Sequence, residues 1–185
     1  MQRLSNVLGI AFGYLTLLLG LAVTGETAAR KVFNWSLQGA DELGGYILAV
    51  SACLAFCVAL VGRNHMRIDV IHYSLSRTGQ AILNWVASAS IAFFSLVLAW
   101  ASYGIIRDTF LYNSTAPTPW ATPLKYPQTV WYAGILAFAL VATLLAAKAT
   151  GLLVAGRWER LAQEFEPKAQ KEELEEELAD ARRRL

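Results

Sequence analysis

Residues 81–106 read AILNWVASASIAFFSLVLAWASYGII, a run of 26 residues without a charged side chain. A helix crosses the hydrocarbon core of a bilayer with about 20 mostly apolar residues, so this run can span a membrane even when it is tilted. Within lipid, a helix satisfies all of its own backbone hydrogen-bonding groups, which a single strand cannot do. The run therefore predicts a membrane-spanning helix.

Three further apolar runs have a similar length: Val7–Ala29, Leu43–Val61 and Val130–Ala147. The sequence thus predicts an all-α integral membrane protein with four transmembrane helices. A signal peptide is the alternative interpretation of the first run, since Arg3 precedes it and small residues close it. That run is longer than the 7–15 apolar residues typical of signal peptides, and the alternative would leave three spans.

The composition agrees with a membrane protein. The chain of 185 residues is 56% hydrophobic and 16% charged, whereas soluble domains carry about 25% charged residues. Residues 157–185 hold 16 of the 30 charged side chains, so the rest of the chain could not cover a water-facing surface. We expect a four-helix transmembrane domain over residues 1–156 and a charged cytoplasmic tail over 157–185. A helix over Lys171–Leu185 would be either solvated or a docking handle for a partner.

Basic residues predict the orientation of the spans. With four spans, the N-terminus, the second loop and the tail share one side and together hold 12 Lys or Arg residues. The first and third loops hold 4, namely Arg30, Lys31, Arg107 and Lys125. Because basic residues stay on the cytoplasmic side, both termini are predicted to be cytoplasmic.

Residues that could carry chemistry are few. His65 and His72 are the only histidines, and both fall in the second loop. We therefore expect no enzyme, no cofactor and no metal site; a membrane enzyme would have to begin from these histidines and Asp69. No nucleic-acid partner is expected either, because the membrane topology explains the modest positive charge. Cys53 and Cys57 are interpreted as small apolar packing residues. Glu26 is the one ionisable residue well inside a predicted span, where it could pair with Arg30 or have a functional role.

Three loop segments are distinctive. Asp41-Glu42-Leu43 begins the second span, where acids suit the positive end of a helix dipole. Arg63-x-His65-x-Arg67-x-Asp69 follows that span, as a topological anchor or as a contact with a partner or lipid headgroups. The third loop carries Thr118-Pro119, Thr122-Pro123 and Pro127-x-x-x-Trp131. Its prolines predict a rigid outer cap.

These segments, with four spans, resemble the small membrane subunit (DctQ-like) of a tripartite ATP-independent periplasmic (TRAP) transporter, over about residues 5–150. The charged tail matches no part of the family pattern. The resemblance implies a bacterial inner-membrane subunit that binds a large multi-span membrane subunit carrying the substrate and sodium sites. It also implies a periplasmic substrate-binding protein that delivers an organic acid.

The small subunit would then brace the large one during sodium-coupled uptake. Nine residues of the family motif are expected at the interface with partner or lipid: Asp41, Glu42, Arg63, His65, Arg67, Asp69, Pro119, Pro123 and Trp131. The alternative function is a self-contained oligomeric four-span channel or carrier. The scarcity of polar residues in the spans argues against it.

Overall fold

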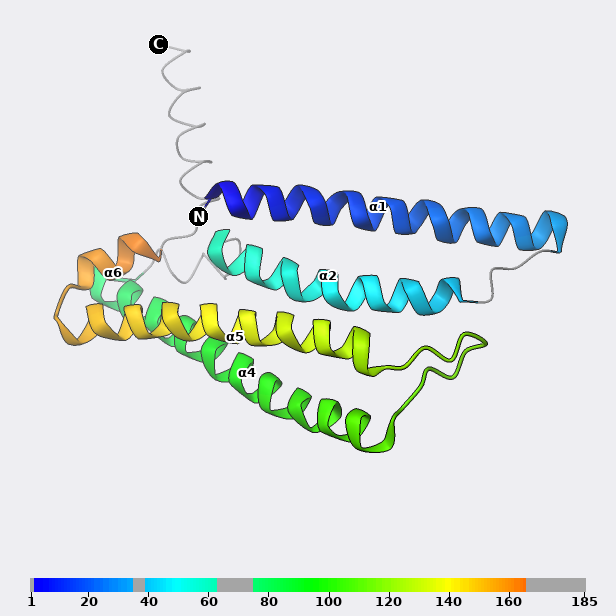
Figure 1. Ribbon diagram of the computed structural model, residues 1–185. Helices are drawn as coiled ribbons and strands as arrows, with labels where there is room; N and C mark the ends of the chain where they lie inside the picture. The colour runs from blue at the N-terminus through cyan, green and yellow to red at the C-terminus, as the bar shows by residue number, and fades with distance from the viewer. Residues whose placement is uncertain (1, 35–38, 63–74, 166–185) are drawn as a thin grey trace, which may run out of the picture. The chain divides into compact units, whose positions relative to one another are not determined.

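The computed structural model describes residues 2–34, 39–62 and 75–165 (Figure 1). Two predicted features lie outside the described residues, namely the charged string Arg63, His65, Arg67 and Asp69, and the helix over Lys171–Leu185. Within the described ranges the chain is helical and forms no strand, apart from one isolated β-bridge between Thr115 and Pro123. The helices are α1 (Gln2–Phe33), α2 (Ala40–Gly62), α4 (Arg77–Tyr112), α5 (Lys125–Val154) and α6 (Trp158–Glu164).

Three of the described helices are long and apolar enough to cross a membrane, over Glu42–Val61, Arg77–Tyr112 and Lys125–Val154. They contain the second, third and fourth apolar runs, so the prediction of an all-α protein with membrane-competent helices is confirmed for these three. The first run, Val7–Ala29, lies within α1, where the side chains of residues 2–9, 11 and 12 are not described. The fourth span and the side on which the termini lie are therefore not confirmed.

The helices divide by their contacts into two compact units. Unit 1 comprises Met1–Val58 and Ser95–Ala139, and unit 2 comprises Ala59–Phe94 and Leu140–Leu185. In unit 1, α1 runs antiparallel to α2 (Figure 1), and Leu19 Cδ1 lies 3.8 Å from the position that a Cβ on Gly44 would occupy.

The core of unit 1 joins α2, α4 and α5 through small side chains. Cys53, Ala99, Ile135 and Ala139 are buried together, with Leu98 and Trp131 packed against them. A Cβ built on Gly134 would lie 2.8 Å from Cys53 Cβ, so α2 and α5 approach each other at a distance that only glycine allows. Cys53 thus occupies the packing role that the sequence predicts for it.

The core of unit 2 holds α6 against α4 and α5. Ala81, Ala149, Leu161 and Ala162 are buried together. The turn into α6 depends on Gly156, whose φ of +68° is favourable only for glycine. Its N–H donates to the Leu153 carbonyl and the next N–H donates to Leu152, a Schellman pattern that closes α5.

A hydroxyl stripe follows one face of α4 at intervals of seven residues: Ser88, Ser95, Ser102 and Thr109, all buried. Ser88 Oγ donates to the Asn84 carbonyl at 2.9 Å, the bond back to its own helix that is expected for a hydroxyl in a span. The stripe gives α4 a narrow face against which other helices can pack closely.

Candidate functional site

The third loop, residues 113–124, folds as a short hairpin between α4 and α5. The Ala116 N–H donates to the Thr122 carbonyl and the Leu124 N–H donates to the Ser114 carbonyl, both at 3.0 Å. At the base of the hairpin, Thr109 Oγ1 of α4 donates to Gln128 Oε1 of α5 at 2.6 Å. The loop is therefore hydrogen-bonded along its length and at its base.

A turn over Thr118–Ala121 forms the tip of this hairpin. The Ala121 N–H donates to the Thr118 carbonyl at 2.9 Å, and Pro119 occupies the second position, where its fixed φ suits a β-turn. Ala121 has a φ of +47°, a conformation that costs free energy for a residue with a Cβ. The contacts around the turn must therefore hold it in place.

Glu42, at the start of α2, provides one set of these contacts. Its residue is 7% exposed, and its carboxylate accepts hydrogen bonds from the Tyr46 hydroxyl at 2.8 Å and from the Thr118 hydroxyl. Thr122 also lies beside this carboxylate and interacts with it. Neutral donors thus surround a buried carboxylate, as a charge removed from water requires.

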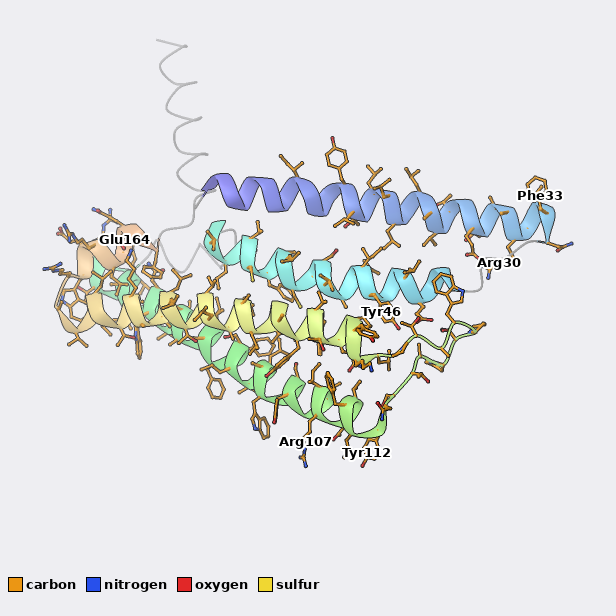
Figure 2. All side chains as sticks on the ribbon, viewed as in Figure 1. Arg30, Phe33, Tyr46, Arg107, Tyr112 and Glu164 are labelled. Atoms are coloured by element: carbon orange, nitrogen blue, oxygen red, sulfur yellow. The ribbon has the colours of Figure 1, made fainter. Side chains whose placement is uncertain are left out.

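Trp120 provides the second contact. A Cβ on Gly39 would lie 2.3 Å from two atoms of the Trp120 indole, so the ring fills the space above a glycine that precedes α2. We call these six residues the loop clasp: Gly39, Glu42, Tyr46, Thr118, Trp120 and Thr122. Tyr46 lies on α2, near the end of the helix that faces the hairpin (Figure 2). The loop clasp joins α2 to a loop about 80 residues away in the chain.

The structure brings some of the predicted motif residues together. Glu42 lies in the loop clasp, and the exposed Pro119 and Pro123 each follow one of its threonines. Asp41 belongs to α2, but its side chain is not described. Trp131 lies instead on α5 against the core of unit 1, where it lines an apolar cavity of about 230 Å³. The other residues that line this cavity are Ala49, Ala52, Cys53, Phe56, Leu98, Ile135 and Phe138.

Sequence reasoning did not single out Gly39, Tyr46 or Trp120 as partners of the motif. One signal was available, because Glu42 and Tyr46 are four residues apart and therefore neighbours on a helix. The Gly39–Trp120 contact has no local signal, since it forms only when the loop folds back onto α2.

The loop clasp contains hydroxyl groups and one carboxylate. This set of groups is better suited to holding a loop in place than to catalysing a reaction. In the described part of the chain, no group of three His, Cys, Asp or Glu side chains could hold a metal ion. The fold and site define a helical membrane protein with a loop locked to the end of one of its spans.

A comparison with protein families identifies the family within this class. The family model for the DctQ component of tripartite ATP-independent periplasmic transporters matches residues 19–150, and the chain belongs to this family. The suspected resemblance is therefore confirmed, and the protein is a small, non-enzymatic TRAP transporter subunit. A search among curated proteins found no match to the chain.

Proposed function

We propose that the chain braces the large multi-span membrane subunit of a TRAP transporter during sodium-coupled uptake of an organic acid in the bacterial inner membrane. Family membership supports the two partners, a large membrane subunit and a periplasmic substrate-binding protein. The observation that carries the bracing role is the loop clasp, which fixes a loop to the end of a span without offering a transport site.

The proposed topology has four spans and two cytoplasmic termini. α1 supports a fourth span, because its 32 residues would extend about 48 Å, more than the roughly 30 Å of the hydrocarbon core. Large apolar side chains on α1, such as Leu17, Leu18 and Leu21, are exposed, as expected for a surface covered by lipid or by another subunit. The hairpin and the loop clasp would then face the periplasm, where the binding protein arrives.

Each end of α2 has a role in this proposal. At the outer end, Asp41 and Glu42 fix the start of the span, and Pro119 and Pro123 stiffen the hairpin that Glu42 holds. At the inner end, Arg63, His65, Arg67 and Asp69 contact the large subunit or lipid headgroups. Trp131 supports the helix packing that keeps the outer end in position. The charged tail over residues 157–185 is proposed to lie in the cytoplasm.

Reconstitution in proteoliposomes tests this function. Vesicles with the chain alone, the large subunit alone, or both should be given a sodium gradient and substrate-loaded binding protein. We expect uptake only when both membrane subunits are present. Uptake by the chain alone would instead identify a self-contained channel or carrier, and full uptake by the large subunit alone would exclude a bracing role.

A further inference from the structure

We propose that a basic surface at the α6 end of unit 2 binds anionic phospholipid headgroups. Three arginines form this surface, which we call the basic rim: Arg77 at the start of α4, and Arg157 and Arg160 at the start of α6. All three are exposed. The proposal concerns this chain's own contact with the bilayer and does not depend on the transport partners.

α6 packs against α4 and α5, so the backbone that carries Arg157 and Arg160 has a defined position in unit 2. Leu161 has no exposed surface and packs with Ala81 and Ala149. Asn84 Nδ2 of α4 donates to the Ala162 carbonyl at 3.4 Å, across the same contact. Residues 157–160, which directly precede the buried Leu161, are all exposed.

The basic rim has three arginines and one neighbouring exposed carboxylate, Glu159, and a second carboxylate is held by an ion pair from α5. Lys148 Nζ lies 2.5 Å from Glu164 Oε2, and Glu164 lies on α6 (Figure 2). Glu164 is one turn beyond Arg160, where it could otherwise have neutralised this arginine. Among the described residues, no carboxylate forms an ion pair with Arg77, Arg157 or Arg160.

The basic rim lies just beyond the end of a membrane-competent helix, the level at which bilayer phosphates are expected. α5 is a membrane-competent helix that ends at Val154, and Arg157 follows three residues later. Trp158, beside Arg157, is 36% exposed, and tryptophan favours the headgroup level. Ala81, one turn after Arg77, packs with α6, which brings Arg77 to the same end of the unit. Guanidinium groups bind phosphate oxygens with two parallel hydrogen bonds, so the partner chemistry is an anionic phosphodiester.

Lipid retention by the purified full chain tests this proposal. The chain should be extracted in mild detergent with equal amounts of phosphatidylglycerol and phosphatidylcholine, and the bound lipid counted by native mass spectrometry. We expect wild type to bind more phosphatidylglycerol than phosphatidylcholine. In the variant Arg77→Gln/Arg157→Gln/Arg160→Gln, the ratio of the two bound lipids should fall about tenfold. The variant with lysine at the same three positions keeps the charge without the bidentate geometry, so its preference should lie between those of wild type and the glutamine variant.

A matched control removes the same charge elsewhere. Arg30, Lys31 and Arg107 are also exposed, and they lie in unit 1. Their triple glutamine variant should keep the wild-type preference. An equal loss in this control, or no loss in the basic-rim variant, would overturn the proposal.

One measurement on the folded wild-type protein keeps the proposal testable if a variant fails to fold. Raising the salt concentration should reduce the preference for phosphatidylglycerol, because ions screen exposed charges; a preference independent of salt would overturn the proposal. The acidic run at 172–177 of the same chain is the alternative ligand of the basic rim, and changing it gives a further test. If phosphatidylglycerol is retained only after Glu172, Glu173 and Glu175 are changed to glutamine, the basic rim binds the chain's own tail instead.

Discussion

Glu42 holds the third loop through hydrogen bonds to its carboxylate. Its carboxylate accepts hydrogen bonds from Tyr46 and Thr118, and it also interacts with Thr122. Hydrogen bonds to an ionised group are about twice as strong as those between neutral groups. A neutral amide at this position would keep the shape of the side chain but lose the charge and one acceptor.

We therefore expect Glu42→Gln to loosen the hairpin. Hydrogen–deuterium exchange should become several-fold faster at the amides of Ala116 and Ala121, and transporter-dependent uptake should fall. Thr118→Ser, which keeps a hydroxyl donor, should change both quantities much less. Unchanged exchange in Glu42→Gln would show that the carboxylate does not hold the loop.

Gly39 gives an independent test of the same loop. A Cβ at this position would enter the indole of Trp120, so Gly39→Ala must displace the ring. We expect faster amide exchange over residues 116–124. Gly45→Ala is the matched control, because a Cβ on Gly45 has no atom within 4 Å, and it should leave the exchange unchanged. Equal exchange in the two variants would contradict the contact.

The pairing of α2 with α5 depends on the close approach at Gly134. A methyl group at this position would lie 2.8 Å from Cys53 Cβ and push the helices apart. We expect Gly134→Ala to lower the free energy of unfolding by about 1–3 kcal/mol, the usual cost of overpacking. Denaturant titration of the chain in detergent micelles measures this loss.

The control for Gly134 lies on α4. No atom lies within 4 Å of a Cβ on Gly104, and glycine inside a helix costs about 0.5–1 kcal/mol relative to alanine. Gly104→Ala should therefore raise the stability by about this amount. If Gly134→Ala were equally stabilising, the described approach of α2 and α5 would be wrong.

The turn between α5 and α6 depends on the backbone of Gly156. Alanine is strained at a φ of +68°, by about 1–2 kcal/mol. We expect Gly156→Ala to open the turn and to speed tryptic cleavage after Arg157 several-fold. Gly151→Ala, within α5, should not change this rate, because a Cβ on Gly151 has no atom within 4 Å. Equal cleavage of both variants would show that the glycine conformation is not needed.

The long apolar helices could be predicted from the sequence, whereas α6 and most of the helix ends and contacts could not. The run at 81–106 identifies a span, but α4 extends over Arg77–Tyr112, because polar residues beyond the hydrocarbon core continue the same helix. Val130–Ala147 likewise underestimates α5, which begins at Lys125. Hydropathy measures the apolar part of a helix, and its ends depend on local hydrogen bonds.

The candidate site could likewise be predicted only in part from the sequence. The sequence marks Glu42 and the proline loop separately, and each has a sufficient local explanation in a helix dipole or a stiff turn. Their contact joins residues 76 positions apart, so it depends on tertiary folding that no local pattern contains. Glu164 is a comparable case, because it pairs with Lys148 only after Gly156 reverses the chain.

The chain as a whole presents many large apolar side chains, among them Phe93 and Trp100 of α4. Arg107 and Tyr112 point away from α4 at the end of this helix (Figure 2). A surface formed by large apolar side chains needs lipid or another membrane subunit to cover it. Membership of the DctQ family implies association with a large membrane subunit, and we propose that this subunit covers part of the apolar surface.

The most direct test is purification of the tagged full-length chain from its native membrane in a gentle detergent, followed by mass analysis of the proteins that accompany it. We predict a larger multi-span membrane protein in equal amounts. The Glu42→Gln variant should recover less of it, whereas Gly45→Ala should recover the wild-type amount. Recovery of the chain alone, or only as a homo-oligomer, would contradict the bracing role and favour a self-contained channel or carrier.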